Sequence, residues 1–281
     1  MNLMPELWRL MEQGSEACLL PDTSSLDSIT RQLPGGFYST FRTYRSRTHV
    51  LGLTAHLDRL YRPAAARRIP PSVSRAQLRQ QLASLLAVFR AEEARVRIML
   101  STEDGSGMVH AAIEPFQALP QVVYSQGVRV VTTDVHRDHP ALKSTVFINE
   151  SQRERRRLFE QSVFEGLIVK DGCILEGLTS NFFYLDEGKL GTARRGVLNG
   201  VTRRQVLRLA RERRMEVSYR ALPVEEISSI EEAFLTSSSR GIVPIAAIND
   251  TQIGSGRVGE GTRRLMHAYD TDVEARLEPI I

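Results

Sequence analysis

Apolar residues recur along this chain at two spacings, which alternate in blocks. Blocks in which apolar, β-branched and aromatic residues alternate with polar ones predict strands in the first half at residues 37–44, 49–53, 95–101 and 108–116. Helical spacing predicts a helix from Thr54 to just before Pro70, and another from a cap at Ser72 or Ser74 to about Phe89. Residues 5–13 favour a further helix, followed by a loop that extends to residue 35.

The second half repeats these patterns in shorter segments. Strands are predicted at residues 127–133, 166–169, 173–176, 181–185, 189–192, 232–237 and 241–248, and helices at residues 149–165, 200–214 and 259–269. Residues 119–126 contain Pro120 and show neither spacing, which predicts a linker. The chain is therefore predicted to be a mixed α and β protein of two domains, residues 1–118 and 127–281, joined by that linker.

The composition of the chain limits the classes of protein to which it can belong. A chain of 281 residues with 42% hydrophobic and 25% charged residues is typical of a globular protein, and no apolar run is long enough to cross a membrane. The first residues lack the layout of a signal peptide and two cysteines fit a reducing compartment, so a cytoplasmic protein is expected. The net charge is +4, but glutamates are interspersed with the arginines of residues 153–157, which indicates a solvated helix rather than a nucleic-acid site.

The 37 basic residues include only three lysines, and one of them stands apart. Lys170 and Lys189 lie in glycine-containing hairpin turns, where a solvated cation is ordinary. Lys143 lies among the apolar and small residues of positions 140–148. A lysine partly removed from water loses affinity for its proton, and its free amine forms Schiff bases. A bias toward arginine codons explains the low lysine content but not the position of Lys143.

A Schiff base forms between an amine and an aldehyde. Two later motifs offer groups that would bind an aldehyde that also carries an aromatic nitrogen and a phosphate. Glu176, followed by Gly177, would hold an aromatic nitrogen in its protonated form if it were buried, and otherwise it is a solvated residue of a hairpin. Gly200-Val201-Thr202 precedes a helix whose first amides would bind phosphate, although such a sequence also begins ordinary helices.

Two more segments add groups that bind anions. The hydroxyls of residues 236–239 end a predicted strand and form either an anion site or a polar turn. Arg59, near the start of the first long helix, would bind a phosphate with its forked guanidinium. His56 lies on the same face and is interpreted as a structural hydrogen bonder. These groups together are the ones that pyridoxal phosphate requires.

The order and spacing of these elements resemble those of the class IV aminotransferases, the fold type IV pyridoxal-phosphate enzymes. That family includes branched-chain aminotransferases, D-amino-acid aminotransferases and aminodeoxychorismate lyase. The resemblance extends from Gly36 to Tyr269. Its most specific parts are His56-Leu57-x-Arg59-Leu60, Lys143, Glu176-Gly177-x-x-Ser180-Asn181, Gly200-Val201-Thr202-Arg203 and Thr236-Ser237-Ser238.

The resemblance implies a small N-terminal α/β domain and a larger C-terminal α/β domain, with pyridoxal 5'-phosphate between them in a homodimer. It implies that Lys143 anchors the cofactor covalently and carries the substrate proton, and that Glu176 pairs with the ring nitrogen. No metal is implied. The remaining cofactor contacts would come from Arg59, Leu198, Val201, Thr202, Ser237 and Ser238, and the substrate contacts from Tyr38, Thr40, Arg42 and Arg97.

Departures from the family pattern leave the substrate open. The Arg-x-His pair of D-amino-acid aminotransferases is missing after Arg97, and Ile148 replaces a tyrosine frequent in branched-chain enzymes. Thr40 falls where the lyases carry a catalytic threonine, but residues 101–104 replace an Arg-Gly run that those lyases often have. The prediction is an aminotransferase acting on an amino acid, branched-chain or hydrophobic, and a 2-oxo acid. A lyase on the same scaffold is the alternative, and a non-catalytic binding protein is a remote one.

Overall fold

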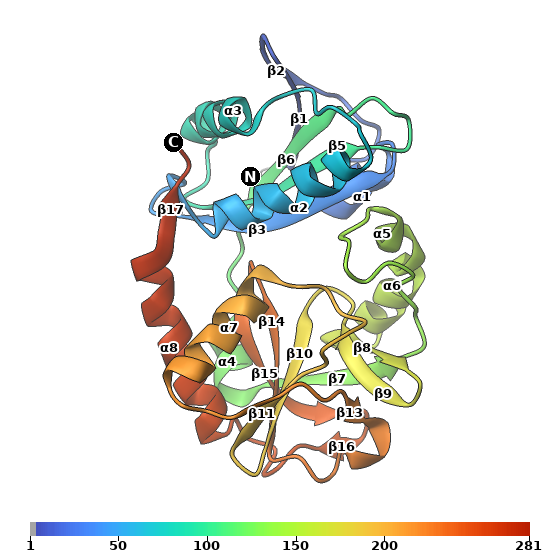
Figure 1. Ribbon diagram of the computed structural model, residues 1–281, viewed down its shortest axis with the longest axis vertical. Coiled ribbons are helices and arrows are strands. Elements are labelled where there is room, and N and C mark those ends of the chain that lie inside the picture. The colour runs from blue at the N-terminus through green and yellow to red at the C-terminus, as the bar shows by residue number, and fades with distance from the viewer. Residues whose placement is uncertain (1–3) are drawn as a thin grey trace. The chain divides into compact units, whose positions relative to one another are not determined.

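The computed structural model describes residues 4–281, which form two compact units (Figure 1). Unit 1 consists of residues 1–117, 142–149 and 275–281, and unit 2 consists of residues 118–141 and 150–274. Each unit is therefore built from segments that are distant in the sequence. The division into residues 1–118, a linker and residues 127–281 stays a prediction.

Unit 1 is built on an antiparallel sheet that includes both ends of the described chain. Its strands, in the order in which they pair, are β17 (Leu277–Pro279), β4 (His49–Leu51), β3 (Gly36–Tyr44), β5 (Ala94–Ser101), β6 (Val109–Pro115), β1 (Glu6–Met11) and β2 (Gly14–Ala17). Its helices are α1 (Leu26–Arg31), α2 (Leu53–Ala66), α3 (Arg75–Val88) and the short α5 (Val146–Glu150).

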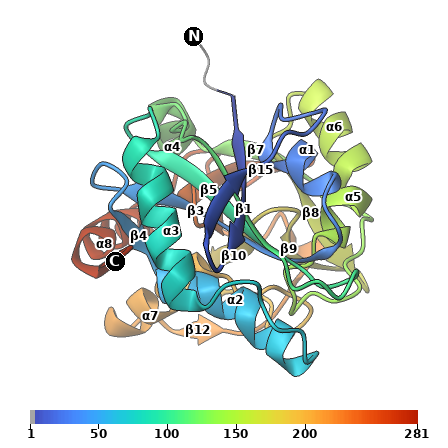
Figure 2. The same ribbon diagram turned by 90° about the horizontal axis from the view of Figure 1, so that it is seen from above.

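The helices of unit 1 cover the sheet from both sides. The apolar faces of α2 and α3 pack with Phe37 and Phe41 in one cluster, whereas α1 packs with Tyr38 and Met99 in another. Neighbouring residues of a strand point to opposite faces, so Phe37 and Tyr38 belong to different clusters. In Figure 2, α1 and α2 lie on opposite sides of the strands. Tyr38 and its alternate neighbours Thr40 and Arg42 therefore share the α1 side.

The predicted elements of residues 36–116 are confirmed, and that of residues 5–13 is wrong. The Ser74 side chain caps α3 and Gln77 closes the capping box. Residues 6–11 form strand β1 of a hairpin instead of a helix. Leu7 and Leu10 have helical spacing, but they lie on opposite faces of a sheet whose two faces are both buried. The predicted loop also contains α1, capped by Ser25.

Unit 2 contains the other sheet of the described residues and most of the remaining helices. Its strands pair in the order β12 (Val217–Ser218), β11 (Lys189–Gly191), β10 (Asn181–Asp186), β14 (Glu232–Ser237), β15 (Gly241–Ile248), β7 (Val128–Thr133), β8 (Glu165–Lys170), β9 (Cys173–Gly177) and β13 (Leu222–Pro223), with β16 (Thr251–Gln252) beside β15. Its helices are α4 (Gln121–Gln126), α6 (Gln152–Glu160), α7 (Val201–Glu212), the 3-10 turn Val224–Glu226 and α8 (Glu260–Arg276).

Six strands of this sheet close into a ring, because β9 pairs with β10 through Glu176 and Asn181. One face of the ring strands carries an apolar cluster that includes Phe182 and Leu235. On the other face, Phe183 and Phe234 stack with their centroids 5.1 Å apart. Helix α7 packs against β14 (Figure 1). The alternation along β10 and β14 thus places Asn181 and Thr236 on the side of Phe183 and Phe234.

Two segments of unit 2 differ from the sequence prediction. The predicted helix of residues 149–165 is divided at Ser151 into α5 and α6, and α6 ends at Glu160. Ser162, with a φ of 54°, lies just after that end and takes a left-handed conformation without a glycine. Glu165, predicted as the last helical residue, instead begins β8. Residues 121–126, predicted as part of a linker, form α4, which packs against β15.

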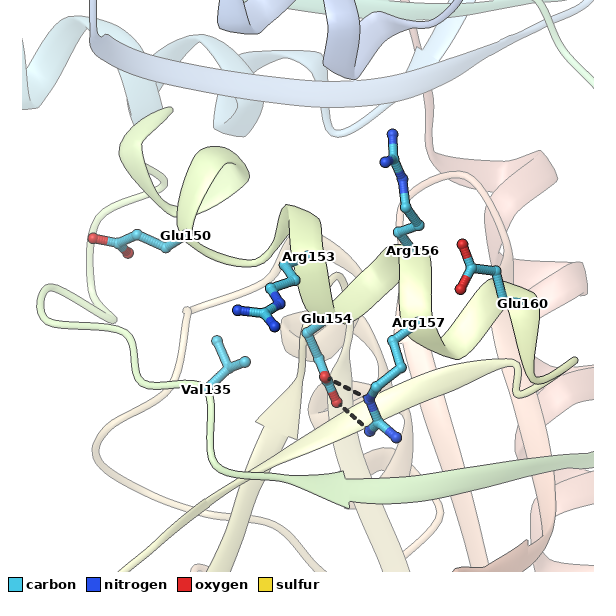
Figure 3. A pocket seen from close by; sticks show the side chains of 7 residues that line it. All are labelled: Val135, Glu150, Arg153, Glu154, Arg156, Arg157 and Glu160. Carbon is cyan, nitrogen blue, oxygen red and sulfur yellow. Dashed lines mark hydrogen bonds and ion pairs between the residues drawn. The ribbon is translucent and has the colours of Figure 1, made fainter.

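The arginine-rich helix α6 borders a shallow surface hollow (Figure 3). Glu154 and Arg157 form an ion pair of 2.7 Å there, and Arg153 and Arg156 reach outward along the same helix. The alternation of charges supports the interpretation of this segment as a solvated helical face. Among residues 4–281, no helix is both long enough and apolar enough to span a membrane.

Candidate active site

Lys143 lies in an irregular segment of unit 1 that pairs with an edge of β3. Strand β4 pairs only with the last two residues of β3, so the edge from Gly36 to Tyr38 is open to another partner. The Tyr38 amide donates to the Lys143 carbonyl at 3.0 Å, and the Thr145 amide donates to the Gly36 carbonyl at 2.9 Å. The Gly36 amide donates to Thr145 Oγ1 at 2.9 Å. These bonds fix the backbone on both sides of Lys143, whose side chain is half-buried.

The Lys143 amine lies close to Tyr38 and so to the predicted substrate residues. Its Nζ is 5.1 Å from the centroid of the Tyr38 ring, and Arg97 Cζ is 4.9 Å from the same centroid. Strand pairing places Thr40 opposite Arg97. The structure therefore brings Lys143, Tyr38, Thr40 and Arg97 together on the α1 side of this sheet.

Arg97 is buried, with 4% of its surface exposed, and most of its donors are occupied. Nε donates to Thr40 Oγ1 at 2.9 Å, and Nη1 donates to Asp27 Oδ1 at 2.7 Å. Nη1 also lies within bonding distance of two α1 oxygens, the Leu26 carbonyl and the Thr30 hydroxyl. Nη2 donates to no atom of residues 4–281. A buried cation requires such a partner, so α1 is the element that holds Arg97.

The other predicted residues of unit 1 lie elsewhere. Arg42 stacks on two rings, with its Cζ 3.8 Å from the Phe116 centroid and 4.4 Å from that of Tyr44. Arg59 lies half-buried on α2, which covers the opposite face of the sheet from Thr40. His56 is fully buried, and its Nδ1 lies 2.7 Å from Ser39 Oγ, which supports its interpretation as a structural hydrogen bonder.

Glu176 in unit 2 is a buried carboxylate with several polar partners. It is 2% exposed and forms an ion pair of 2.8 Å with Arg137. Its other oxygen accepts from Asn181 Nδ2 at 3.0 Å and from the Leu198 amide at 2.9 Å. Burial lowers the pKa of the nearby Arg203 from its usual value, and the charge of Glu176 acts in the opposite direction. Opposite charge and hydrogen bonding both favour the ionised carboxylate. Because Glu176 is 2% exposed, the alternative of a solvated glutamate in a hairpin is wrong.

Asn181 connects Glu176 to the start of α7. Its Nδ2 donates to the Leu198 carbonyl at 2.8 Å as well as to Glu176, which fixes the segment before the helix. A Cβ on Gly200 would lie 2.1 Å from Asn181 Oδ1, so glycine permits this close approach. Strand pairing continues the polar row from Glu176 through Asn181 to Thr236 across three strands.

The start of α7 has unsatisfied groups of the kind that phosphate satisfies. Gly200 is its N-cap and provides no side-chain hydrogen bond, so the first amides have no cap. The hydroxyl groups of Thr202 and Thr236, both 2% exposed, have no hydrogen-bond partner among residues 4–281. Ser237 and Ser238 follow Thr236 and are half-buried. These hydroxyls and amides fit a phosphate, and the buried Glu176 fits a protonated ring nitrogen.

Several residues of these clusters were not among the predicted site residues. Arg137 lies in the irregular segment before Lys143, and only the tertiary structure shows that it pairs with Glu176. In the sequence, Asn181 stands out only as part of the motif that begins at Glu176, and Thr236 only as one of the hydroxyl residues 236–239. Asp27 lies in a region predicted to be a loop, and its capped helix could have been found from Ser25 and Ser28.

The family description for class IV amino-transferases matches residues 36–248 of the chain. A probable branched-chain-amino-acid aminotransferase of Thermotoga maritima is 31% identical over 89% of this chain and 91% of its own length. A D-alanine aminotransferase of Bacillus licheniformis is 26% identical over 94% and 95% of the two chains. An aminodeoxychorismate lyase of Bacillus subtilis is also 26% identical, over 85% and 86%. The chain therefore belongs to the class IV aminotransferase family.

Solved structures agree on the fold. A putative branched-chain amino acid aminotransferase from Thermotoga maritima has a TM-score of 0.79 at 27% identity, covering 96% of both chains. A branched-chain amino acid aminotransferase of T.th. with pyridoxamine 5'-phosphate has a TM-score of 0.80 at 18% identity and covers both chains fully. The predicted fold class, a two-domain fold type IV enzyme, is confirmed.

Proposed function

We propose that this protein is a pyridoxal-phosphate-dependent aminotransferase that moves an amino group between an amino acid and a 2-oxo acid. The observation that carries the proposal is the polar cluster of unit 2. It combines a buried, ion-paired Glu176 with an uncapped helix start and the unpartnered hydroxyls of Thr202 and Thr236. Those are the complements of a pyridine nitrogen and of a phosphate, the two ends of one cofactor.

Bound pyridoxal phosphate supplies an aldehyde that takes up the amino group and a ring that withdraws electrons from the substrate α-carbon. In the proposed site, Glu176 holds the ring nitrogen in its charged form, and Arg137 and Asn181 keep that carboxylate ionised and oriented. Val201 and Thr202 offer amides, and Thr202, Ser237 and Ser238 offer hydroxyls to the phosphate. Arg59 is proposed as a further phosphate contact and Leu198 as the side chain against the ring.

Lys143 is proposed as both the covalent anchor and the proton carrier. Its backbone is fixed on β3, and its amine lies 5.1 Å from the centroid of the Tyr38 ring. Arg97, Tyr38 and Arg42 are proposed to bind the substrate. The Nη2 of Arg97 is the donor left for a substrate carboxylate, because Thr40 and α1 occupy the others. Tyr38 also belongs to a buried cluster with Met99 and Ile148, and these hydrophobic surroundings support the proposal of a hydrophobic or branched-chain substrate.

A lyase that forms p-aminobenzoate and pyruvate from aminodeoxychorismate is the second candidate. The position of Thr40 favours it, because its hydroxyl accepts a hydrogen bond from Arg97 Nε on the same side of the sheet as Tyr38. An aminotransferase requires an oxo-acid acceptor, whereas the lyase requires none. We further propose a homodimer located in the cytoplasm, with no nucleic-acid or membrane partner, and a sedimentation measurement of the mass tests the dimer.

The test uses the purified protein with added pyridoxal phosphate. Visible absorbance of the bound cofactor, followed by a screen of L- and D-amino donors against 2-oxoglutarate and pyruvate, is expected to show transfer that depends on both substrates. Formation of p-aminobenzoate without an acceptor would favour the lyase instead. A protein that shows no cofactor absorbance and no turnover would contradict both and favour a non-catalytic binding protein.

A further inference from the structure

Two turns of unit 2 carry the groups proposed to hold the cofactor, and a single arginine joins them. One turn, residues 177–180, follows Glu176 and leads into β10. The other, residues 238–240, follows Ser237 and leads into β15. Arg240 ends the second turn, and its guanidinium reaches the first. Its Nη2 donates to Thr179 Oγ1 at 2.7 Å, and its Nε donates to Ser237 Oγ at 3.1 Å.

A buried carboxylate completes the connection. Glu165, at the start of β8, is 4% exposed, and its Oε2 accepts from Arg240 Nη2 at 2.9 Å. Its Oε1 accepts from the Thr179 hydroxyl at 2.8 Å and also from the Thr179 amide. The two oxygens of Glu165 therefore hold the two turns at once, one through Arg240 and one directly. The Arg240 side chain is 22% exposed, so removal of Arg240 is the more costly change, because it leaves the buried carboxylate without its ion pair.

The surroundings of Arg240 restrict it to this position. The Phe164 ring lies 5.3 Å from its Cζ, and Tyr124 donates a hydrogen bond of 2.9 Å to its carbonyl. A Cβ on Gly177 would lie 2.9 Å from Glu165 Oε1, so the first turn approaches the carboxylate as closely as glycine allows. The pair has no net charge, because the carboxylate balances the guanidinium. It is thus suited to fixing geometry rather than to attracting an anion.

We infer that Arg240, held by Glu165, is a positioning residue that fixes the Ser237–Ser238 segment relative to the Glu176 turn and so sets the affinity for the cofactor. This inference rests on the proposed function. The competing role is direct contact between Arg240 and the phosphate. The two roles differ in the effect of removing Glu165. Loss of its charge frees Arg240 and strengthens a direct phosphate contact, but it loosens a positioned turn.

The experiment measures the dissociation constant of pyridoxal phosphate by absorbance for the wild type and for Glu165→Gln, Arg240→Gln and the double variant. Positioning predicts that each single variant binds at least tenfold more weakly, and that the double variant is no weaker than the worse single one. Arg240→Lys keeps the charge but not the fork, and it is expected to restore only part of the affinity. Arg220→Gln breaks an exposed Arg–Glu pair of the same unit and is expected to bind as the wild type does.

Each other outcome overturns the inference. Tighter or unchanged binding by Glu165→Gln, with weaker binding by Arg240→Gln, makes Arg240 a phosphate ligand. Unchanged binding by both variants, with only a lower melting temperature, makes the pair structural. If Arg240→Gln does not fold, Thr179→Val removes one hydroxyl that contacts both partners, and it is expected to weaken binding about threefold, whereas unchanged binding overturns the inference. A wild type that does not bind the cofactor overturns the proposed function and the positioning role with it.

Discussion

Replacement of Glu176 by glutamine separates the structural role of this residue from its chemical one. The wild-type carboxylate is 2% exposed and its partner Arg137 has a side chain that is 11% exposed, so the pair is well shielded from water. The Leu198 amide and Asn181 Nδ2 donate to the other oxygen. A glutamine oxygen can serve those two donors, but its amide group then faces the Arg137 guanidinium, and two donors oppose each other.

The expected cost follows from that geometry. Removing one member of a buried ion pair leaves the other charge without compensation and costs about 3–5 kcal/mol. A domain has a total stability of about 5–15 kcal/mol, so the loss is a large part of it. Replacing Arg137 by glutamine in the same variant removes the stranded charge and lets two amides bond. The double variant Glu176→Gln/Arg137→Gln is expected to regain about 2 kcal/mol or more of the loss.

The assay is urea unfolding followed by circular dichroism, with turnover measured on the same samples. The single variant is expected to be strongly destabilised and inactive, and the double variant more stable yet still inactive, because no carboxylate faces the ring nitrogen. The rate loss is expected to exceed about three orders of magnitude, which corresponds to roughly 4 kcal/mol of barrier. A stability within about 1 kcal/mol of wild type in the single variant would refute the argument from the ion pair. Recovered activity in the double variant would remove Glu176 from the mechanism.

Three other outcomes are expected. Lys143→Ala should abolish the visible absorbance of bound cofactor without loss of the fold, because the hydrogen bond from the Tyr38 amide to the Lys143 carbonyl does not involve the replaced side chain; a persisting band in this variant would identify another lysine. Gly200→Ala places a Cβ against Asn181 Oδ1, so a loss of about 1–3 kcal/mol in unfolding free energy and weaker cofactor binding are expected, and wild-type values would contradict the close approach. Burial lowers the pKa of His110 from 6.5 to about 4, so the neutral ring stabilises the fold above pH 6.5. That contribution, up to about 3 kcal/mol, is lost as the pH falls from 6.5 to 4, and wild type minus His110→Gln in unfolding experiments should show this dependence.

Much of the fold is predictable from the sequence, because the local preferences of the residues for helix or strand agree with the burial that the tertiary structure requires. The hairpin of β3 and β4, the capped helix α3 and the strands β5 and β6 all have the period that their burial requires. The helical spacing of Leu7 and Leu10 does not predict strand β1, because these two residues are buried on opposite faces of one sheet and no single period indicates that arrangement. Helix α6 ends at Glu160, and Ser162 just after it takes a left-handed conformation that its residue type does not predict.

The sequence by itself determined the family and predicted pyridoxal-phosphate chemistry. Lys143, Glu176, Thr202 and the serines after Thr236 are predicted as site residues because their residue types and spacing are those that the proposed cofactor would require. Only the tertiary structure decided how those groups are held. It pairs Glu176 with Arg137, anchors Lys143 on the open edge of β3, and joins two turns through Arg240 and Glu165. Contacts of this kind depend on which segments meet in space, and a local pattern carries no information about a partner that is distant along the chain.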